Sequence, residues 1–426
     1  MTRTLLAWQG GAPCFICHGW RYGTQRTIIP YLDTACMTSK ERHDARYLRR
    51  KQKRIEKRKA RFEEIGGLAG AFTFHDMFKD GKDCCRGVRW KHSVQNFELH
   101  LFSATAVARA KVLSGKWQPQ SYTKFTIRER GKARPIEAPK IRDRQVQKGI
   151  TRRILLPLCR PCMIHNNGAS LKGKGFKFSQ DQLKKELREH YKRYGTDGRI
   201  LLLDFSKFFP TASHDWVRHN HRRLMFDEDI IRLCGTTLRG DGLPLGVEPS
   251  QAEMIYYPSA LDNWLKCQCG YNGMGHYMDD YYILLPPGAK DPTEDIIQKA
   301  AAIGLTVNRA KTVLRPLSKP FRYCKIRYSV RERIKTLGSR EAYQRAKRKL
   351  DMFSRRILAG EISPEDARAS LAATMSYFDN YNDSLRKKRL LDRMAMEGIC
   401  TTFVSGVSSG TPSAALSISL MGKGSQ

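Results

Sequence analysis

The stretch GHYMDDYYILL, residues 275–285, places two adjacent carboxylates, Asp279 and Asp280, between aromatic residues and an aliphatic run. Side chains that follow each other on a β-strand point to opposite faces of the sheet, so both acids cannot lie on one solvated face of a strand. A tight hairpin with the acids at its tip and a strand on either side explains the pattern better. A surface turn without function is the alternative, because Asp is common in turns for local hydrogen-bonding reasons.

A third carboxylate, Asp204, follows the aliphatic part of GRILLLDFSKFFP, residues 198–210, which predicts a strand ahead of a helix around residues 213–224. If this strand neighbours the hairpin in one antiparallel sheet, the three acids converge. Converging carboxylates repel one another unless a cation neutralises them, and their oxygen atoms suit Mg²⁺. Two such ions about 4 Å apart can activate an attacking hydroxyl and stabilise a leaving pyrophosphate. The acids therefore indicate nucleotide polymerisation.

The composition indicates a polyanionic partner. The chain has 426 residues, enough for two or three domains, and 77 Lys and Arg against 41 Asp and Glu give a formal net charge of +36. Nucleic acid is favoured over a membrane surface, because no apolar run reaches the ~18 residues that span a bilayer. The N-terminus lacks the sustained apolar core of a signal peptide, so we expect a cytoplasmic protein.

The two ends of the chain differ in composition from the middle. Residues 1–36 carry few charges and are expected to be an extension outside the core. Residues 37–69 are expected to form a basic helical arm, because the run from Lys40 to Arg61 has twelve Lys and Arg residues and no Pro or Gly. A solvated helix is the alternative to an arm that tracks phosphates. The Ser- and Gly-rich tail, residues 399–426, is expected to be disordered.

The 12 cysteines are expected to be reduced thiols, and two groupings suggest cofactors only weakly. The CXXCH motif at residues 14–18 has the spacing of c-type haem attachment, which takes place after export, and no export signal is visible. The CXXC pair at residues 159–162 could form half of a zinc site, but the CXC pair at residues 267–269 has the wrong spacing for the other half.

The sequence YMDD within the opening stretch resembles the catalytic motif of reverse transcriptases, and further blocks follow that family's order. These blocks are, in chain order, RGKARPIEAPKIRDRQVQ, NNGASLKGKG, LLLDFSKFFP, GLPLGVEPSQ, LTVNRAKT and FRYCKIRY. The resemblance covers about residues 70–395 and implies an α+β, right-hand polymerase fold. Fingers would occupy residues 70–196, a palm with an antiparallel sheet packed on helices residues 197–318, and primer grip and helical thumb residues 319–398.

The resemblance implies a role for each residue that matches a block. Asp204 and Asp279 would bind two Mg²⁺ ions, for which Mn²⁺ can substitute, with Asp280 as a supporting acid and the backbone of Phe205 beside them. The nucleotide site would comprise Lys132, Arg134, Phe209, Leu245, Gly246, Gln251 and Lys311. Contacts to template and primer would come from Lys172, Lys174, Ser250, Tyr323 and Lys325.

Several of these roles are specific. Phe209 would be the aromatic gate that excludes a ribose 2′-hydroxyl, and Lys311 would be a general acid for pyrophosphate. Lys132 and Arg134 would grip the triphosphate, since a guanidinium forms a planar fork suited to phosphate. Gly246 would let the backbone approach the nascent base pair, because no Cβ obstructs it.

Each role has a plainer alternative. Phe209 could be an ordinary core residue, because aromatic pairs beside a strand usually are. Lys132 and Arg134 could be ordinary hairpin charges, and Lys172 and Lys174 could merely decorate a loop. The histidines without paired ligand spacing are expected to be structural: His165, His214 and His276.

Two positions depart from the commoner family pattern, in which Gln precedes the motif's glycine and Pro follows its serine. Leu245 and Gln251 stand there instead, a variant that resembles the enzymes of bacterial diversity-generating retroelements, which copy a template RNA with errors at adenines. Leu245 offers no hydrogen bond beside the base pair, which relaxes discrimination, although it could simply pack against the next helix. Retron, group II intron and phage-defence relatives stay open.

The resemblance thus implies an RNA-directed DNA polymerase of a bacterial retroelement or prophage, acting on an RNA template, a DNA or RNA primer and dNTPs, with room for an accessory RNA-binding protein. A phage-defence terminal transferase would share the metals. An RNA-binding maturase that has lost catalysis is a further alternative, but clustered acids are costly to keep in a fold that does not use them.

Overall fold

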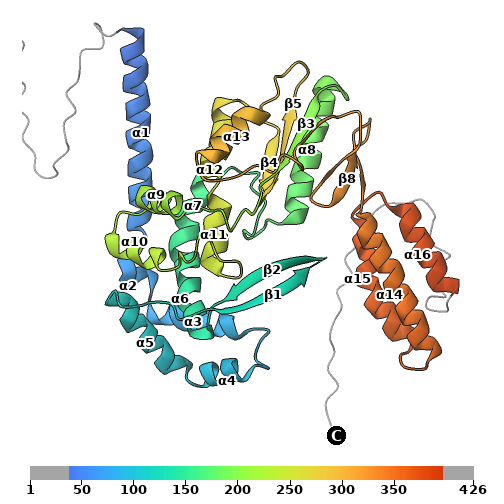
Figure 1. Cartoon of the computed structure of the whole chain (residues 1–426), viewed down its shortest axis with the longest axis horizontal. Helices are drawn as coiled ribbons and strands as arrows, with labels where there is room; N and C mark the ends of the chain where they lie inside the picture. Colours follow the sequence, from blue (N-terminus) through green and yellow to red (C-terminus); the bar gives the residue numbers. More distant parts are fainter. Residues whose placement is uncertain (1–37, 130, 397–426) are drawn as a thin grey trace, which may run out of the picture. The chain divides into compact units, whose positions relative to one another are not determined.

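The computed structural model describes residues 38–129 and 131–396 (Figure 1). The chain divides into two units between Glu56 and Lys57, inside the first helix. The expectations for residues 1–36 and 399–426, including the CXXCH motif, lie outside the described residues.

The first unit contributes most of α1 (Ser39–Glu63), the helix predicted for the basic arm. Thr38 and Glu41 cap its start reciprocally: the Thr38 amide donates to the Glu41 carboxylate at 2.6 Å, and the Glu41 amide donates to Thr38 Oγ1 at 3.3 Å. None of residues 38–56 is buried. Such a helix gains its stability from partners or local pairs rather than from a core.

After the end of α1, the second unit continues with four helices and a hairpin. The helices are α2 (Gly67–Ala71), α3 (Phe74–Cys85), α4 (His92–Leu99) and α5 (Leu101–Leu113). They precede the antiparallel hairpin of β1 (Thr123–Glu129) and β2 (Lys132–Ala138), whose turn contains Gly131 at φ 79°. The helical run after the hairpin comprises α6 (Ile141–Gly149), the π-helical turn η2 (Ile150–Leu155), α7 (Leu156–Cys159) and the 3₁₀ turn η3 (Arg160–Cys162).

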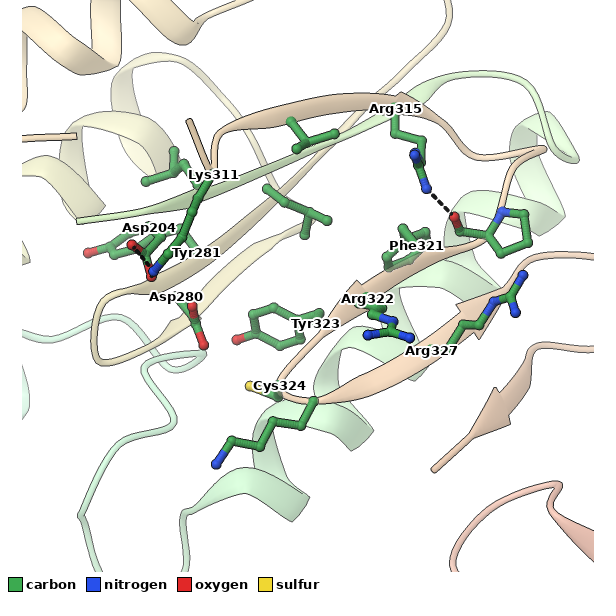
Figure 2. Close-up of a pocket in the computed structure, with 15 residues that line it drawn as sticks. Asp204, Asp280, Tyr281, Lys311, Arg315, Phe321, Arg322, Tyr323, Cys324 and Arg327 are labelled. Carbon is green, nitrogen blue, oxygen red and sulfur yellow. Dashed lines mark hydrogen bonds and ion pairs between the residues drawn. The ribbon is translucent and has the colours of Figure 1, made fainter. Parts of the chain in front are cut away.

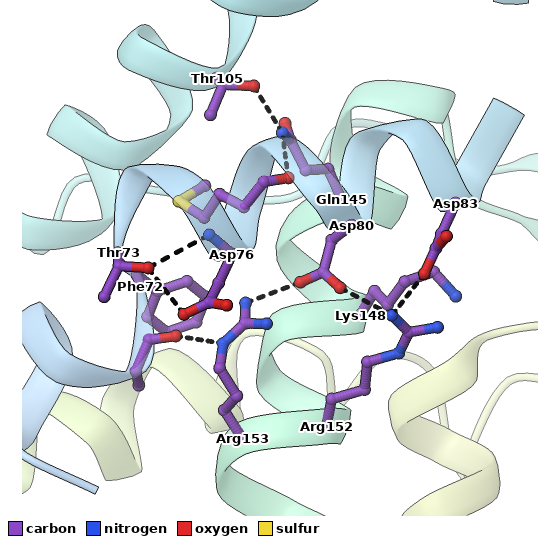
Figure 3. Close-up of polar contacts among 12 residues, drawn as sticks. Phe72, Thr73, Asp76, Asp80, Asp83, Thr105, Gln145, Lys148, Arg152 and Arg153 are labelled. Atoms are coloured by element: carbon purple, nitrogen blue, oxygen red, sulfur yellow. Dashed lines mark hydrogen bonds and ion pairs between the residues drawn. The ribbon is translucent and has the colours of Figure 1, made fainter.

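A buried acid ties these helices together (Figure 3). Asp80 of α3 is 1% exposed and pairs with two consecutive arginines of η2, with Arg152 Nη1 at 3.0 Å and Arg153 Nη2 at 2.7 Å. Gln145 of α6 donates to the Met77 carbonyl at 2.8 Å. Because a buried charge is tolerated only with good partners, this network fixes α3 against the helical run that follows the hairpin.

The central sheet has four antiparallel strands in the order β4-β5-β3-β6. Its strands are β3 (Arg199–Asp204), β4 (Met274–Tyr277), β5 (Asp280–Leu285) and β6 (Val313–Pro316). The helices around it are α8 (Phe176–Tyr194), α9 (His214–Leu224), α10 (Glu228–Gly235), α11 (Glu248–Tyr256), α12 (Ser259–Asn263) with the π-helical turn η4 (Trp264–Gln268), and α13 (Thr293–Ala301). Ser213 caps α9 by accepting from the Trp216 amide at 3.3 Å, where the sequence predicts that helix to begin.

Both faces of this sheet are buried, which explains why its strands are continuously apolar. Alternate residues of β3 and β5 pack on opposite sides of the sheet. Leu201, Leu203 and Ile283 join a core with α9, α11, α12 and α13, whereas Ile200 and Leu284 pack with α8 and the small sheet described next. The acids therefore stand at the end of a sheet that two cores hold in place.

The C-terminal part consists of a small sheet and a helical bundle. The sheet contains β7 (Phe321–Tyr323), β8 (Ile326–Ser329) and β9 (Lys335–Leu337), and the bundle contains α14 (Arg340–Leu358), α15 (Pro364–Asp379) and α16 (Ser384–Met396). Ser363 Oγ caps α15 by accepting from the Asp366 amide at 3.1 Å. The predicted fold class is confirmed as an α+β chain, with antiparallel sheets packed on helices and a helical bundle after the small sheet.

The segment before α8 is pinned to the edge of the central sheet. The His276 amide donates to the Asn166 carbonyl at 3.1 Å, and the Gly168 amide donates to the His276 carbonyl at 2.9 Å. A Cβ on Gly168 would lie only 1.7 Å from Ser179 Oγ and 3.1 Å from Ser179 Cβ. This glycine is therefore required by the close approach of α8.

Gly168→Ala should lower the free energy of unfolding by about 1–3 kcal/mol, because the added methyl group overfills the contact with α8. Adding Ser179→Ala should restore part of the loss, since it removes the nearer of the two clashing atoms. Thermal unfolding of the parent, both single variants and the double variant measures the coupling. Strictly additive losses would show that the two residues do not meet.

Candidate active site

The three predicted acids meet at one end of the central sheet. Asp204, the last residue of β3, lies directly opposite Asp280, the first residue of β5. Asp280 also pairs with Tyr277 of β4, so Met278 and Asp279 form a two-residue turn. Met278 has φ 54°, a left-handed conformation that costs a non-glycine residue about 1–2 kcal/mol. The predicted hairpin and its neighbouring strand are thus both present, with Asp279 in the turn itself.

The electrostatics of this cluster favour a cation. Burial, followed by the charges of Asp279 and Asp204, raises the pKa of Asp280 to about 6. The pKa of Asp279 is also raised, again by burial first and then by Asp204. Lys311 supplies a positive charge, with Nζ 2.7 and 2.8 Å from the two Asp204 carboxylate oxygens, and the hydrogen bond to Asp204 raises the pKa of Lys311.

Lys311 reaches the acids because the loop before β6 is bonded to the end of β3. Phe205, which is buried, forms a bridge with Val307, and the Asn308 amide donates to the Asp204 carbonyl at 2.8 Å. Two predicted residues, Phe205 and Lys311, therefore lie beside the acids by backbone pairing, although Lys311 is 107 residues from Asp204 in the chain.

A cavity of about 570 Å³ opens between the acids and the β7–β8 hairpin (Figure 2). Asp204, Asp280 and Tyr281 line one side, and Tyr323 and Cys324 line the other. Its other charged lining residues are all basic: Lys311, Arg315, Arg322, Lys325 and Arg327. The cavity therefore has a small acidic end within a basic wall, which suits an anionic polymer whose reacting end meets cations at the acids.

The turn of the β7–β8 hairpin has an unusual backbone. Cys324 (φ 46°) and Lys325 (φ 66°) are both left-handed, as a type I′ turn requires, yet neither is glycine. Tyr323 packs edge-on against Tyr282 of β5 at 4.9 Å between ring centroids. Lys325 Nζ lies 5.2 Å from the Phe176 ring centroid, and its charge opposes part of the rise that burial causes in the pKa of Asp280. Both predicted primer residues therefore lie close to the acids.

The β1–β2 hairpin brings a positive charge near the acids. Burial raises the pKa of Asp279, and the charge of Arg134, the predicted triphosphate ligand, offsets a small part of that rise. For Lys132 the structure describes the backbone, in β2. The Glu137 amide donates to the Leu245 carbonyl at 2.9 Å, and a Cβ on Gly246 (φ 102°) would lie 2.9 Å from Ile136. Gly246 is thus required by contact with β2, a reason that differs from the predicted approach to a base pair.

Neighbouring phenylalanines occupy different environments after β3. Phe208 is 5% exposed and stacks on Phe205 at 5.8 Å, whereas Phe209 is only partly buried at the margin of the same core. The Phe209 carbonyl accepts from the Leu243 amide at 2.9 Å, which joins this loop to the one that carries Leu245. Phe209 therefore has an accessible edge, as a gate would need, and the core interpretation fits Phe208 better.

The remaining predicted contacts are divided between accessible and structural positions. Gln251 is exposed and donates to Ser170 Oγ at 2.6 Å, while Ser250 is buried, at 1% exposure. Lys174 donates to the carbonyls of His165 and Asn167 at 2.6 and 2.9 Å. Its position supports the structural alternative for Lys174, whereas Lys172 is exposed.

Within residues 38–129 and 131–396, no group of three or more His, Cys, Asp or Glu side chains is arranged to hold a metal ion by itself. The CXXC pair at residues 159–162 thus gains no zinc site from the described part of the chain. The three acids can contribute only part of a coordination shell, which suits Mg²⁺, an ion that keeps waters and binds substrate phosphates. No helix among the described residues is long and apolar enough to cross a membrane.

Two groups beside the site were not predicted from the sequence. The basic wall of the cavity includes Arg315, Arg322 and Arg327, which alternate with apolar residues along short strands and could have been noticed by that spacing. His276, predicted to be merely structural, contacts the carbonyl of Met278 in the acid-bearing turn. Its position inside the opening stretch was the available signal.

No protein-family model and no curated protein matches the sequence. The chain is similar to the solved structure of a telomerase from Candida albicans in complex with a TWJ fragment of telomeric RNA, with 11% identity, 70% of this chain and 63% of that chain covered, and a TM-score of 0.43. It is also similar to apo telomerase from Candida tropicalis, truncated from its C-terminal domain, with 13% identity, 56% of this chain and 60% of that chain covered, and a TM-score of 0.39. A third similar structure is an insertion-loop deletion mutant of the RNA-dependent RNA polymerase of a human picobirnavirus, with 12% identity, 68% of this chain and 63% of that chain covered, and a TM-score of 0.41. The chain spans about three fifths of the length of these proteins, and at such TM-scores we conclude nothing about activity from them.

Proposed function

We propose that this chain is an RNA-directed DNA polymerase of a bacterial retroelement or prophage. The observation that carries the proposal is the register of the central sheet, which sets Asp204 directly opposite Asp280 and places Asp279 in the adjoining turn. The basic cavity beside the acids and the YMDD-centred order of blocks in the sequence support it. An RNA template, a DNA or RNA primer and dNTPs are the substrates.

Asp204 and Asp279, with Asp280 in support and the backbone of Phe205 beside them, would hold two Mg²⁺ ions. Once bound, these ions activate the primer hydroxyl and stabilise the charge on the leaving pyrophosphate. The raised pKa values of Asp279 and Asp280 fit this role, because burial and the neighbouring carboxylates raise them and a bound cation would favour the ionised acids.

The other residues divide the work of binding and proton transfer. Arg134 binds the triphosphate with its planar fork, and Lys325 and Tyr323 hold the primer end next to the acids. Lys311 holds a proton on Nζ, because its bond with Asp204 raises its pKa. From this position the Lys311 ammonium would donate its proton to the leaving pyrophosphate.

Asp279→Asn should reduce nucleotide addition by about 10³-fold or more, to background, because loss of one carboxylate removes several kcal/mol of metal-assisted stabilisation. RNA affinity should be almost unchanged, since basic residues supply it. Primer extension with Mg²⁺ and RNA filter binding measure the two effects. Asp215→Asn is the matched control, because Asp215 is an acid on α9 whose side chain is 93% exposed. Extension by Asp279→Asn at the rate of this control would refute the assignment.

Phe209→Val should increase incorporation of ribonucleotides relative to deoxyribonucleotides by about tenfold, because it opens space beside C2′ of the sugar. Competition between dNTPs and rNTPs in single-nucleotide extension gives the ratio. Phe208→Leu is the control: it alters the buried neighbour and should reduce stability without changing sugar selection. Unchanged discrimination in Phe209→Val would assign Phe209 to the core.

RNA affinity should fall steeply with salt, since basic side chains release counterions from phosphates. Replacing Arg46, Arg50 and Arg54, one exposed stripe of α1, with Gln should make the log–log slope shallower by about 2 units. The control replaces Lys79, Lys111 and Lys116 with Gln, which removes the same charge from scattered exposed positions. Equal slopes for both triple variants would mean that α1 acts only through net charge.

A further inference from the structure

A buried polar network joins α12 to the hairpin of β4 and β5. Asp262 of α12 is 0% exposed, and His276 and Tyr281 are each 1% exposed. His276 Nε2 is 3.1 Å from Asp262 Oδ2, and the Tyr281 hydroxyl donates to Asp262 Oδ1 at 2.8 Å. The His276 and Tyr281 rings are cross-strand neighbours and stack at 4.4 Å with 5° between their planes.

The free end of this network meets the turn. His276 Nδ1 is 3.0 Å from the carbonyl oxygen of Met278, the left-handed residue that precedes Asp279. A carbonyl oxygen can only accept, so Nδ1 carries a proton and donates it. On the opposite side of the ring, Asp262 holds Nε2 and thereby fixes the ring plane.

The backbone of His276 is fixed as well, so its imidazole holds the turn in a defined position relative to the sheet. Its amide and carbonyl both bond to the segment around Asn166 and Gly168, as described above. The donor that holds Met278 therefore sits on a part of the hairpin that cannot shift by itself. A strained turn persists only where its surroundings determine it to this degree.

We propose that His276, oriented by Asp262 and Tyr281, is a positioning residue: its Nδ1–H holds the Met278 carbonyl and so sets the place of Asp279 relative to Asp204. This inference rests on the proposed function for its effect on catalysis, and on the contacts alone for its effect on the turn. It gives the buried histidine a role in rate rather than in stability only.

Two substitutions separate the two nitrogens of the ring. His276→Asn places an amide N–H near the position of Nδ1, whereas His276→Gln places one near Nε2. The proposal expects His276→Gln to lower kcat for dNTP addition by about tenfold or more with little change in KM, and His276→Asn to stay within about threefold of the parent. Hydrogen exchange of a peptide spanning residues 274–285 should speed up in the Gln variant and not in the Asn variant.

The matched control is the other buried histidine–carboxylate pair. His221 Nε2 is 2.6 Å from Glu253 Oε1, and these residues are 2% and 3% exposed. Its Nδ1 has no hydrogen-bond partner among the described residues and so holds no turn. His221→Asn and His221→Gln should lower Tm while kcat and exchange of residues 274–285 stay at parent values.

Asp262→Asn provides a milder test if the His276 variants unfold. Its amide can donate to Nε2 and accept from Tyr281, which leaves the proton on Nδ1, so kcat should stay within about threefold of the parent. Equal kcat and equal exchange in the two His276 variants, or a tenfold loss in Asp262→Asn, would overturn the proposal. If the parent adds no nucleotide, the proposed function fails, and the exchange data still decide whether His276 holds the turn.

Discussion

The rest of this structure depends on the three carboxylates that lie at one end of the central sheet. Because the pKa of Asp280 is raised to about 6 in the fold, its contribution to stability is present at low pH and is lost as the pH rises through that value. At neutral pH the ionised acids therefore oppose folding unless positive charge offsets them. Lys311 supplies that charge directly, and Lys325 and Arg134 add to it from two other elements.

The acids also require one register between β3 and β5, and the burial of both faces of the sheet specifies it. A slip of one residue between β3 and β5 would carry Asp204 away from Asp280 and turn every apolar side chain of the strand to the opposite core. The two cores differ in composition, one built with α9, α11, α12 and α13 and the other with α8 and the small sheet. The packing thus penalises any register except the one that brings the acids together.

The sequence predicts the hairpin, the helix that begins around residue 213 and the convergence of the acids, because each depends on local spacing or on one period-2 pattern. It does not predict the contact of Lys311 with Asp204, since that contact depends on backbone pairing across the sheet. The sequence predicts a glycine at position 246 because of a close approach to nucleic acid, whereas in the structure a Cβ there would meet residues of β2. The proposed role of His276 was not predicted from the sequence. The spacing of histidines along a chain can indicate a metal site, but it does not indicate that a histidine ring donates a hydrogen bond to a nearby backbone carbonyl.

The left-handed turn at Cys324 also brings a sulfur atom to the edge of the cavity. Burial raises the pKa of this thiol to about 12, so it is almost entirely protonated at neutral pH. Since the thiolate is the form that alkylating agents attack, Cys324 should be almost inert although it lines the cavity. Among the described cysteines, Cys267 and Cys269 are exposed, and they are the natural attachment points for fluorophores or spin labels that leave the cavity untouched.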